Sequence, residues 1–213
     1  GRATPSHSTL CLAGFSSSRL ADPEPGTEHE ALINTPKRVP VEISPAPDGV
    51  KFQGGHDGYV LSHGLTHART IELTNDGRGL VGEDMILAIE DAEKRRFDAA
   101  LDAGELKGLR FDIRFHLHPE VDATIDLGGA AVSMALKSGE VWVFRHDGGH
   151  NLTLEPGAYL ETTRLKPRAA QQIVLSGMAY TYATRVRWSL SKAQETAIAV
   201  RDLSMDEPYM EES

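Results

Sequence analysis

Residues 110–118 read Arg-Phe-Asp-Ile-Arg-Phe-His-Leu-His, and this stretch decides the fold class. Phe111, Ile113 and Phe115 fall on one face, while their polar neighbours fall on the other. Side chains alternate between the two faces of a β-strand, so strict alternation over this length predicts a strand with one buried face. Residues 185–190, Arg-Val-Arg-Trp-Ser-Leu, show the same alternation and predict a second strand of this kind.

Weaker alternation predicts further strands at residues 9–13, 39–43, 59–62, 68–74, 80–86, 130–136, 141–144 and 171–176. The strand at 141–144 is apolar at every position, which predicts cover on both of its faces. Glycine-containing turn signals stand at 48–49, 75–77, 128–129, 138–139 and 147–149, and each indicates a hairpin. Turns spaced about ten residues apart predict an all-β fold, a large antiparallel β-sandwich of stacked sheets.

Two stretches depart from this pattern. Residues 21–47 contain six prolines and predict a long surface excursion with one edge strand. Residues 90–108 are charged and rich in alanine, with apolar residues at helix-like spacing, and predict either a short surface helix closed by Gly108 or a loop insertion. We expect residues 1–203 to form the β-sandwich domain and the acidic tail at 204–213 to be disordered.

The chain has 213 residues and a formal net charge of −9 at pH 7. An acidic balance argues against general nucleic-acid binding, which needs a basic surface. A site for an acidic polysaccharide would therefore have to be a local basic groove. Cys11 is the single cysteine, so no intrachain disulfide can form. No apolar run approaches the roughly 20 residues that span a bilayer. The compartment stays undetermined.

Nine histidines raise the question of metal or acid–base chemistry. His56, His63 and His67 cluster in a predicted hairpin and are candidates for facing a substrate, although polar hairpin positions would explain them equally well. His116 and His118 share one strand face and could together hold a metal ion, but such a site needs a third ligand. The alternative is a polar sheet face on which the two imidazoles are partly packed.

Four arginines lie on the polar faces of predicted strands, namely Arg110, Arg114, Arg185 and Arg187. If these strands were neighbours, the arginines would form a basic stripe able to meet a carboxylate ligand such as a uronic acid, or another domain, with Arg114 and Arg187 as the substrate-facing candidates. The favoured alternative is cross-strand charge pairing on a solvated face, which contributes under ~1 kcal/mol per pair. The sequence contains no nucleophile elbow, phosphate-binding glycine loop, HExxH or CxxC pattern. No catalytic residue is therefore assigned.

Three parts of the chain, in their order and spacing, resemble the C-terminal region of bacterial heparinase II/III-like proteins of the alphaproteobacterial type. The first is Arg-Ala-Thr-Pro-Ser-His-Ser-Thr-Leu at 2–10. The second runs from His-Asp-Gly-Tyr at 56–59 through Gly-Leu-Thr-His at 64–67 to Gly-Glu-Asp at 82–84. The third runs from Arg-Phe-His-Leu-His-Pro at 114–119, through Ser-Gly-Glu-Val-Trp at 138–142 and Gln-Gln-Ile-Val-Leu-Ser-Gly at 171–177, to Arg-Val-Arg-Trp at 185–188.

The resemblance implies an N-terminal helical toroid followed by antiparallel sheets, in a carbon–oxygen lyase that cleaves uronic-acid polysaccharides by β-elimination. It places the main catalytic residues before Gly1, in the toroid and at the start of the sheet region. It also matches His7 to a structural zinc ligand of several members, whose partner ligands lie upstream. His7 alone cannot hold zinc, so we expect no cofactor in this chain, with zinc confined to a full-length parent of periplasm or cell envelope.

The first hypothesis is therefore the sheet domain of a polysaccharide lyase, inactive by itself because the toroid is absent. An uncovered docking face and free sheet edges predict that the isolated chain associates or binds a hydrophobic dye. A second hypothesis is a non-catalytic carbohydrate-binding β-sandwich module, which would need exposed aromatic side chains along a groove. A third is a small metal-dependent β-barrel enzyme that uses His116 and His118.

Overall fold

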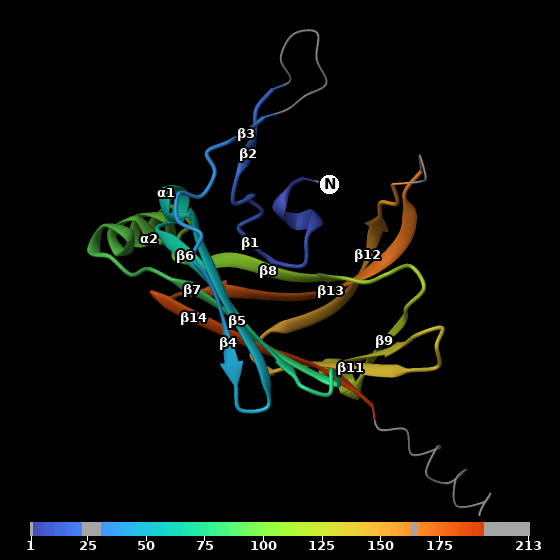
Figure 1. Cartoon of the computed structure of the whole chain (residues 1–213). Helices are drawn as coiled ribbons and strands as arrows, with labels where there is room; N and C mark the ends of the chain where they lie inside the picture. Colours follow the sequence, from blue (N-terminus) through green and yellow to red (C-terminus); the bar gives the residue numbers. More distant parts are fainter. Residues whose placement is uncertain (1, 23–30, 163–165, 194–213) are drawn as a thin grey trace, which may run out of the picture.

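A computed structural model describes residues 2–22, 31–162 and 166–193, and two antiparallel sheets form its body (Figure 1). The large sheet has the order β4 (Val41–Ala46), β5 (Gly49–Tyr59), β6 (Leu65–Thr74), β7 (Gly79–Leu87), β14 (Ala183–Lys192), β11 (Val141–His146), β10 (Ala131–Ala135), β9 (Asp122–Asp126). The small sheet has the order β1 (Leu10–Leu12), β8 (Leu109–His116), β13 (Arg168–Ala179), β12 (Asn151–Tyr159). The all-β sandwich prediction is confirmed.

The small sheet turns the alternating residues of β8 toward the large sheet. Phe111 and Ile113 are fully buried, and β13 pairs antiparallel with β8 so that Leu175 lies opposite Ile113. From the large sheet, Trp188 packs edge-on against Phe115 with ring centres 4.7 Å apart, and Phe144 lies 4.8 Å from the same ring. These contacts close the core between the sheets, because apolar side chains from two facing pleated surfaces interdigitate.

The predicted hairpin turns hold with one exception. Turns at 48–49, 75–77, 128–129 and 138–139 join strands that are neighbours in the large sheet. The prediction of a hairpin at 147–149 is wrong, because this turn carries the chain from β11 in the large sheet to β12 in the small sheet. The prediction that residues 141–144 are covered on both faces is also wrong, since Val141 is exposed on the outer face.

Two helices lie at one end of the sandwich: α1 (Val60–His63) and α2 (Asp91–Ala103) (Figure 1). The prediction of a helix near 90–108 is confirmed, with its end at Gly104 rather than Gly108. It begins with a capping box, in which the Glu90 and Glu93 side chains bond the free backbone N–H groups of the first turn. The predicted strand at 59–62 is wrong, because the chain turns into α1 and Gly64 ends it with a left-handed φ of +69°.

Strands β5, β9 and β12 were not predicted as such, and β5 shows why. Its glycines interrupt the apolar alternation, yet they fit a close approach of backbones. A Cβ on Gly55 would lie 2.9 Å from the His67 carbonyl oxygen of the neighbouring strand. The short strand β2 (Arg19–Leu20), just before the proline-rich excursion, pairs with β3 (Leu32–Ile33) within it. Two 3-10 turns, η1 (Thr4–Ser6) and η2 (Leu127–Gly129), complete the elements.

The large sheet is twice as wide as the small one, and this difference leaves part of it uncovered. The hairpin of β4 and β5 runs past the edge of the small sheet (Figure 1). On the face that elsewhere forms the core, Val41, Ile43, Val50 and Leu73 are consequently exposed. No helix in the described ranges is long and apolar enough to cross a membrane. The tail at 204–213 lies outside the described residues.

Replacing Gly64 by alanine is expected to destabilise the protein by about 2–4 kcal/mol, because a left-handed conformation and a steric clash add up. The added Cβ would lie 2.1 Å from the backbone oxygen of Glu93 in α2. Gly77 is a matched control, with φ +67° and no atom within 4 Å of its Cβ position. Gly77→Ala should therefore cost only about 1 kcal/mol. Urea unfolding of both variants measures the difference, and equal losses would contradict the clash.

Candidate functional site

A buried carboxylate, Asp84, holds together the centre of the large sheet. It is fully enclosed on β7 and accepts hydrogen bonds from three neighbouring side chains. His67 Nε2 lies 2.7 Å away, Arg69 Nε and Nη2 lie at 2.8 and 3.0 Å, and Trp188 Nε1 donates at 2.9 Å. Gly82 makes room for this arrangement, since a Cβ there would fall 2.1 Å from the Trp188 ring. The network links β6, β7 and β14.

Burial and pairing act in opposite directions on Asp84. Burial alone would raise its pKa, but the hydrogen bond from His67 and the charge of Arg69 outweigh it and hold the pKa below its ordinary value. Arg69 also donates from Nη1 to the Ser8 carbonyl at 2.6 Å, which ties the N-terminal segment to the sheet. Removing one partner of such a buried pair is strongly destabilising, because it leaves a charge without compensation.

The hydrogen bonds assign the tautomers of two of the predicted substrate-facing histidines. His56 Nδ1 accepts from the Gly58 backbone N–H at 3.2 Å, so neutral His56 carries its proton on Nε2. That nitrogen lies 3.3 Å from His67 Nδ1, which must accept, leaving the proton of His67 on Nε2 for Asp84. Every imidazole nitrogen in this row is therefore occupied. Neither ring has a free lone pair with which to take a proton from a substrate.

The pKa of His56 agrees with this assignment. Burial is the largest cause and lowers the pKa of His56 to about 4, with a further lowering by the neighbouring His67. The charge of Asp57 acts in the opposite direction and raises this pKa. The local bond from Gly58 to His56 has a counterpart elsewhere in the chain. The same tripeptide, His-Asp-Gly, recurs at 146–148, and His146 Nδ1 also accepts from Gly148 N–H at 3.2 Å. Only His56 adds a buried partner ring, so tertiary packing sets its protonation.

His63, the third histidine of the predicted cluster, lies apart from this row. It ends α1, it is buried, and its Nδ1 lies 2.8 Å from the hydroxyl of Ser62. Phe15 packs edge-on against the ring, with centres 5.3 Å apart. Burial lowers the pKa of His63. The predicted role of His56, His63 and His67 in facing substrate stays a prediction, and the structure places two of these three rings inside the protein.

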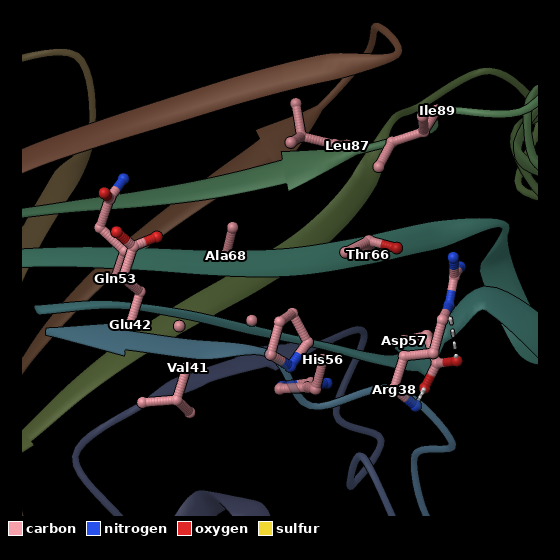
Figure 2. A pocket seen from close by; sticks show the side chains of 13 residues that line it. Arg38, Val41, Glu42, Gln53, His56, Asp57, Thr66, Ala68, Leu87 and Ile89 are labelled. Carbon is pink, nitrogen blue, oxygen red and sulfur yellow. Dashed lines mark hydrogen bonds and ion pairs between the residues drawn. The ribbon is translucent and has the colours of Figure 1, made fainter.

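A groove of about 450 Å3 runs beside His56 over strands β4 to β7 (Figure 2). Glu42 and Gln53 stand at one end, whereas Arg38 and Asp57 meet at the other (Figure 2). Burial opposes the ionisation of Asp57, but hydrogen bonds from two backbone N–H groups and from the Arg38 side chain hold its pKa below the ordinary value. The charged groups at this end are thus already paired.

A second cavity, of about 780 Å3, lies on the outer face of the small sheet next to η1. Arg114 of β8 lines it with 17 % of its side chain exposed. Across the cavity, the Tyr159 hydroxyl has no hydrogen-bond partner among the described residues, although its ring contacts His118. Gln172 fixes its amide by donating to the Pro156 carbonyl, and its buried Oε1 has no donor among the described residues.

Local charge favours an anion in this second cavity. Arg114 supplies a positive charge to this cavity, and the Asp112 carboxylate with which it pairs at 3.3 Å is shared with Arg110 outside the cavity. Asp112 also accepts a bond of 2.7 Å from the Ser176 hydroxyl. The volume of the cavity falls in the range of about 300–1,000 Å3 typical of small-molecule sites.

The other two arginines of the predicted stripe lie on the opposite side of the molecule. Arg185 and Arg187 project from the outer face of the large sheet and pair with Glu83 on the adjacent β7 at 3.8 and 3.0 Å. The four arginines therefore do not form one stripe, and the favoured alternative of local charge pairing is what the structure shows. Arg114 and Arg187 cannot meet one ligand together, and contact of either with substrate stays a prediction.

The predicted metal residues are also separated. His116 Nε2 donates to the Pro5 carbonyl at 3.0 Å, while His118 lies beyond the end of β8 and accepts from the Glu120 N–H. His7 is exposed at the end of η1. Among residues 2–22, 31–162 and 166–193, no three His, Cys, Asp or Glu side chains are placed to hold a metal ion. A zinc role for His7 in a longer protein stays a prediction.

A family model described as heparinase II/III-like, C-terminal, matches residues 1–189. The chain belongs to this family. It is 29 % identical over 163 residues to FtsZ-localized protein C of Caulobacter vibrioides, covering 76 % of this chain and 27 % of that protein. Thus the chain spans about a quarter of the length of its curated relative.

Solved heparinase structures share the fold. Heparan sulfate lyase HepC from Pedobacter heparinus superimposes with a TM-score of 0.63 at 12 % identity, over 91 % of this chain and 25 % of that protein. A further heparinase III structure gives a TM-score of 0.60, also at 12 % identity, over 92 % of this chain and 25 % of that protein. At such identity the likeness shows the fold alone, and the chain again spans a quarter of each structure.

Sequence reasoning missed the centre of the polar network. Asp84 and Arg69 were not singled out, and Trp188 was read only as a core residue. The sequence did indicate a buried carboxylate, because Asp84 lies on the same face of β7 as the apolar Leu80 and Ile86. A charged residue at a core position requires buried partners. Which partners it has could not be inferred, since β14 lies about a hundred residues further along the chain.

Acidification should destabilise the protein through His56. Unfolded His56 takes up a proton below its ordinary pKa of 6.5, whereas the folded group does so only near 4. The unfolded state therefore binds more protons in this window, and the free energy of unfolding should fall by up to about 3 kcal/mol as the pH drops across it. His63, with its lowered pKa, adds an effect of the same sign.

The test compares the pH dependence of urea unfolding in His56→Gln and His146→Gln. The first variant removes the titrating group, so its unfolding free energy should vary less between pH 6.5 and 4 than that of the unmodified protein. His146 makes the same local hydrogen bond but lies outside the row of His56 and His67. His146→Gln should therefore retain the original slope of unfolding free energy against pH. An unchanged slope in His56→Gln would contradict the assignment of His56 as the acid-sensitive group.

Proposed function

We propose that this chain is the sheet domain of a polysaccharide lyase that cleaves uronic-acid chains by β-elimination, and that it binds substrate rather than moving protons. The observation that carries the proposal is the match of residues 1–189 to the heparinase II/III-like family, supported by the shared fold. Heparan sulfate is the substrate named for one of the structural relatives. For this chain, a uronate-containing polysaccharide is the corresponding expectation.

The reaction needs a base, an acid and a positively charged group. A base removes the proton at C5 of the uronate, the bond from C4 to the glycosidic oxygen breaks as a C4–C5 double bond forms, and an acid protonates the leaving oxygen. A positive group must also neutralise the carboxylate to stabilise the developing enolate. Within the described residues, His56 and His67 cannot serve as the base because their nitrogens are occupied. We propose that the proton transfers belong to the helical toroid that the family resemblance implies.

Arg114 is the residue of this chain suited to the carboxylate. A guanidinium binds carboxylates through two parallel N–H bonds. The hydrogen bond from Arg114 to Asp112 uses only Nη2, at 3.3 Å. Partial burial strengthens the attraction of Arg114 for a carboxylate, because the surroundings screen its charge less than water does. The neighbouring hydroxyl of Tyr159 can meet a sugar hydroxyl group. We infer that one uronate unit occupies this cavity.

The chain alone should release no unsaturated uronate from heparan sulfate or alginate, as followed by ultraviolet absorbance. A protein extended at its N-terminus to include a helical toroid should release it, because the acid and base are then present. Absorbance from the chain alone would contradict this division of roles and make Tyr159 the first candidate base. Activity from neither protein, together with retained binding, would favour the non-catalytic carbohydrate-binding module.

Binding can be tested on this chain by calorimetry with a glucuronate-containing oligosaccharide. Arg114→Gln should weaken binding by at least about tenfold, because a charge-assisted bond to the carboxylate is lost. Arg110→Gln is the matched control: it lies on the same strand and pairs with the same Asp112, but it is 65 % exposed and does not line the cavity. Equal effects of both variants, or equal binding of the carboxyl-reduced oligosaccharide, would contradict a specific uronate contact.

A second candidate function follows from sequence similarity. FtsZ-localized protein C is 29 % identical to this chain, whereas the lyase structures are only 12 % identical. The name records localisation with FtsZ, so this domain would then act as a binding module at the division site. Co-sedimentation of the purified chain with FtsZ polymers, combined with silence in the lyase assay, would favour this candidate over the first.

A further inference from the structure

Strand β4 and the residues 38–40 that precede it form one edge of the large sheet, and the hydrogen bonds show which backbone groups of this segment are free. The carbonyls of Arg38 and Pro40 accept from Asp57 and Gly55 of β5. In an antiparallel strand, successive residues direct their N–H and C=O groups to opposite sides. Val39, Val41 and Ile43 consequently direct theirs away from β5, and no described strand pairs with that side.

The same three residues carry exposed apolar side chains. Val39, Val41 and Ile43 are 59, 60 and 69 % exposed, and all three lie on one face of the sheet. That face is continuous with Val50 and Leu73, which the small sheet also leaves uncovered. A flat edge with free backbone groups and β-branched side chains is a template for pairing with another strand.

The opposite edge of the large sheet is protected, in contrast to β4. Strand β9 carries Asp122 and Asp126, which lie at symmetric positions about Thr124. Antiparallel pairing of two β9 strands about that residue would place Asp122 opposite Asp126 of the other copy, and like charges directly opposite each other are destabilising. At β4 the proline that blunts the edge, Pro45, stands only at the end of the apolar run.

We infer that β4 is a self-association edge, and that its partner is β4 of a second copy of this chain, antiparallel about a two-fold axis at Val41. In this register Val41 faces Val41 of the second copy, and Val39 faces Ile43 of the second copy in both directions. All three β-branched positions are then matched, as an isologous interface requires. The two large sheets become one continuous sheet, with their exposed apolar faces on the same side.

Charge on the other face of the strand agrees with this register. Arg38 then lies diagonally across from Glu42 of the second copy, within reach of long side chains. Glu42 has no ion-pair partner among the described residues, and this contact would add to the pairs that Arg38 already makes with Asp57 and Glu93. A register shifted by one residue, with Glu42 facing itself, would set two carboxylates against each other. A shift the other way would oppose Ile43 to Lys37.

Disulfide trapping tests the register. Val41→Cys should form a covalent dimer under mild oxidation, because paired strand residues have Cα atoms about 5.5 Å apart, within the disulfide range. Val39→Cys alone should not, since the two copies of that position would be offset by about 13 Å along the strand. A mixture of Val39→Cys and Ile43→Cys should cross-link. Cys11 is buried and does not compete.

Sedimentation over a concentration series tests the association itself. A contact along one strand buries little area, so the dimer should be weak. Val41→Lys places two ammonium groups across the axis and should raise the dimer Kd by at least about tenfold. Val81→Lys, on β7 at 56 % exposure, is the matched control and should leave it unchanged.

Three results would overturn the inference: a monomer at every concentration, equal effects of the two lysine variants, or Val39→Cys cross-linking as readily as Val41→Cys. Circular dichroism and the melting temperature establish that each variant is folded. Cross-linking of Val41→Cys remains informative even if Val41→Lys unfolds the protein. Because the association uses no residue of the Arg114 cavity, its outcome is independent of whether the chain binds a uronate.

Discussion

Neutralisation of the Asp84 carboxylate inside the large sheet is the constraint on which the rest of the structure depends. A bare carboxylate at that depth would cost several kcal/mol, so its oxygens must be bonded by donors from neighbouring strands. Arg69 supplies the charge, Trp188 supplies an N–H from β14, and His67 supplies the last donor. The register of β6, β7 and β14 is thereby specified more tightly than apolar packing alone would require.

The same network explains why the histidines do not form an acid–base site. His67 must present its N–H to Asp84, and this leaves its other nitrogen to accept from His56, which in turn accepts from Gly58. Because each N–H group in this row donates to the next group, neither imidazole keeps a free lone pair. The polar row thus contributes to the stability of the sheet, and the positive charge that we propose for a ligand lies on the other sheet, at Arg114.

The unequal width of the two sheets has a second consequence. Eight strands face four, so apolar residues of the β4–β5 hairpin have no opposing layer in the described chain. The large sheet can reduce this exposure only by adding another strand or another layer. A second copy paired at β4 joins the two exposed patches, whereas the Arg114 cavity lies on the small sheet, at the far side of the sandwich. The two surfaces can therefore act independently.

By itself the sequence determined the fold class and its inward faces. The alternation in 110–118 and 185–190 identified Phe111, Ile113, Val186 and Trp188 as inward residues, since period-two patterning is a local property of the strand. It also indicated most hairpins and the helix at 91–103, whose capping residues are local too. The resemblance in three segments led to the family.

Only the tertiary structure decided which strands lie together, and hence which charges meet. Arg114 and Arg187 occupy equivalent polar phases in the sequence, yet they lie on opposite outer faces, because β8 and β14 belong to different sheets. His56 and His146 share the tripeptide His-Asp-Gly, but only His56 meets a buried ring. Pairings between residues far apart in the chain set burial and protonation, and local patterning carries no information about them.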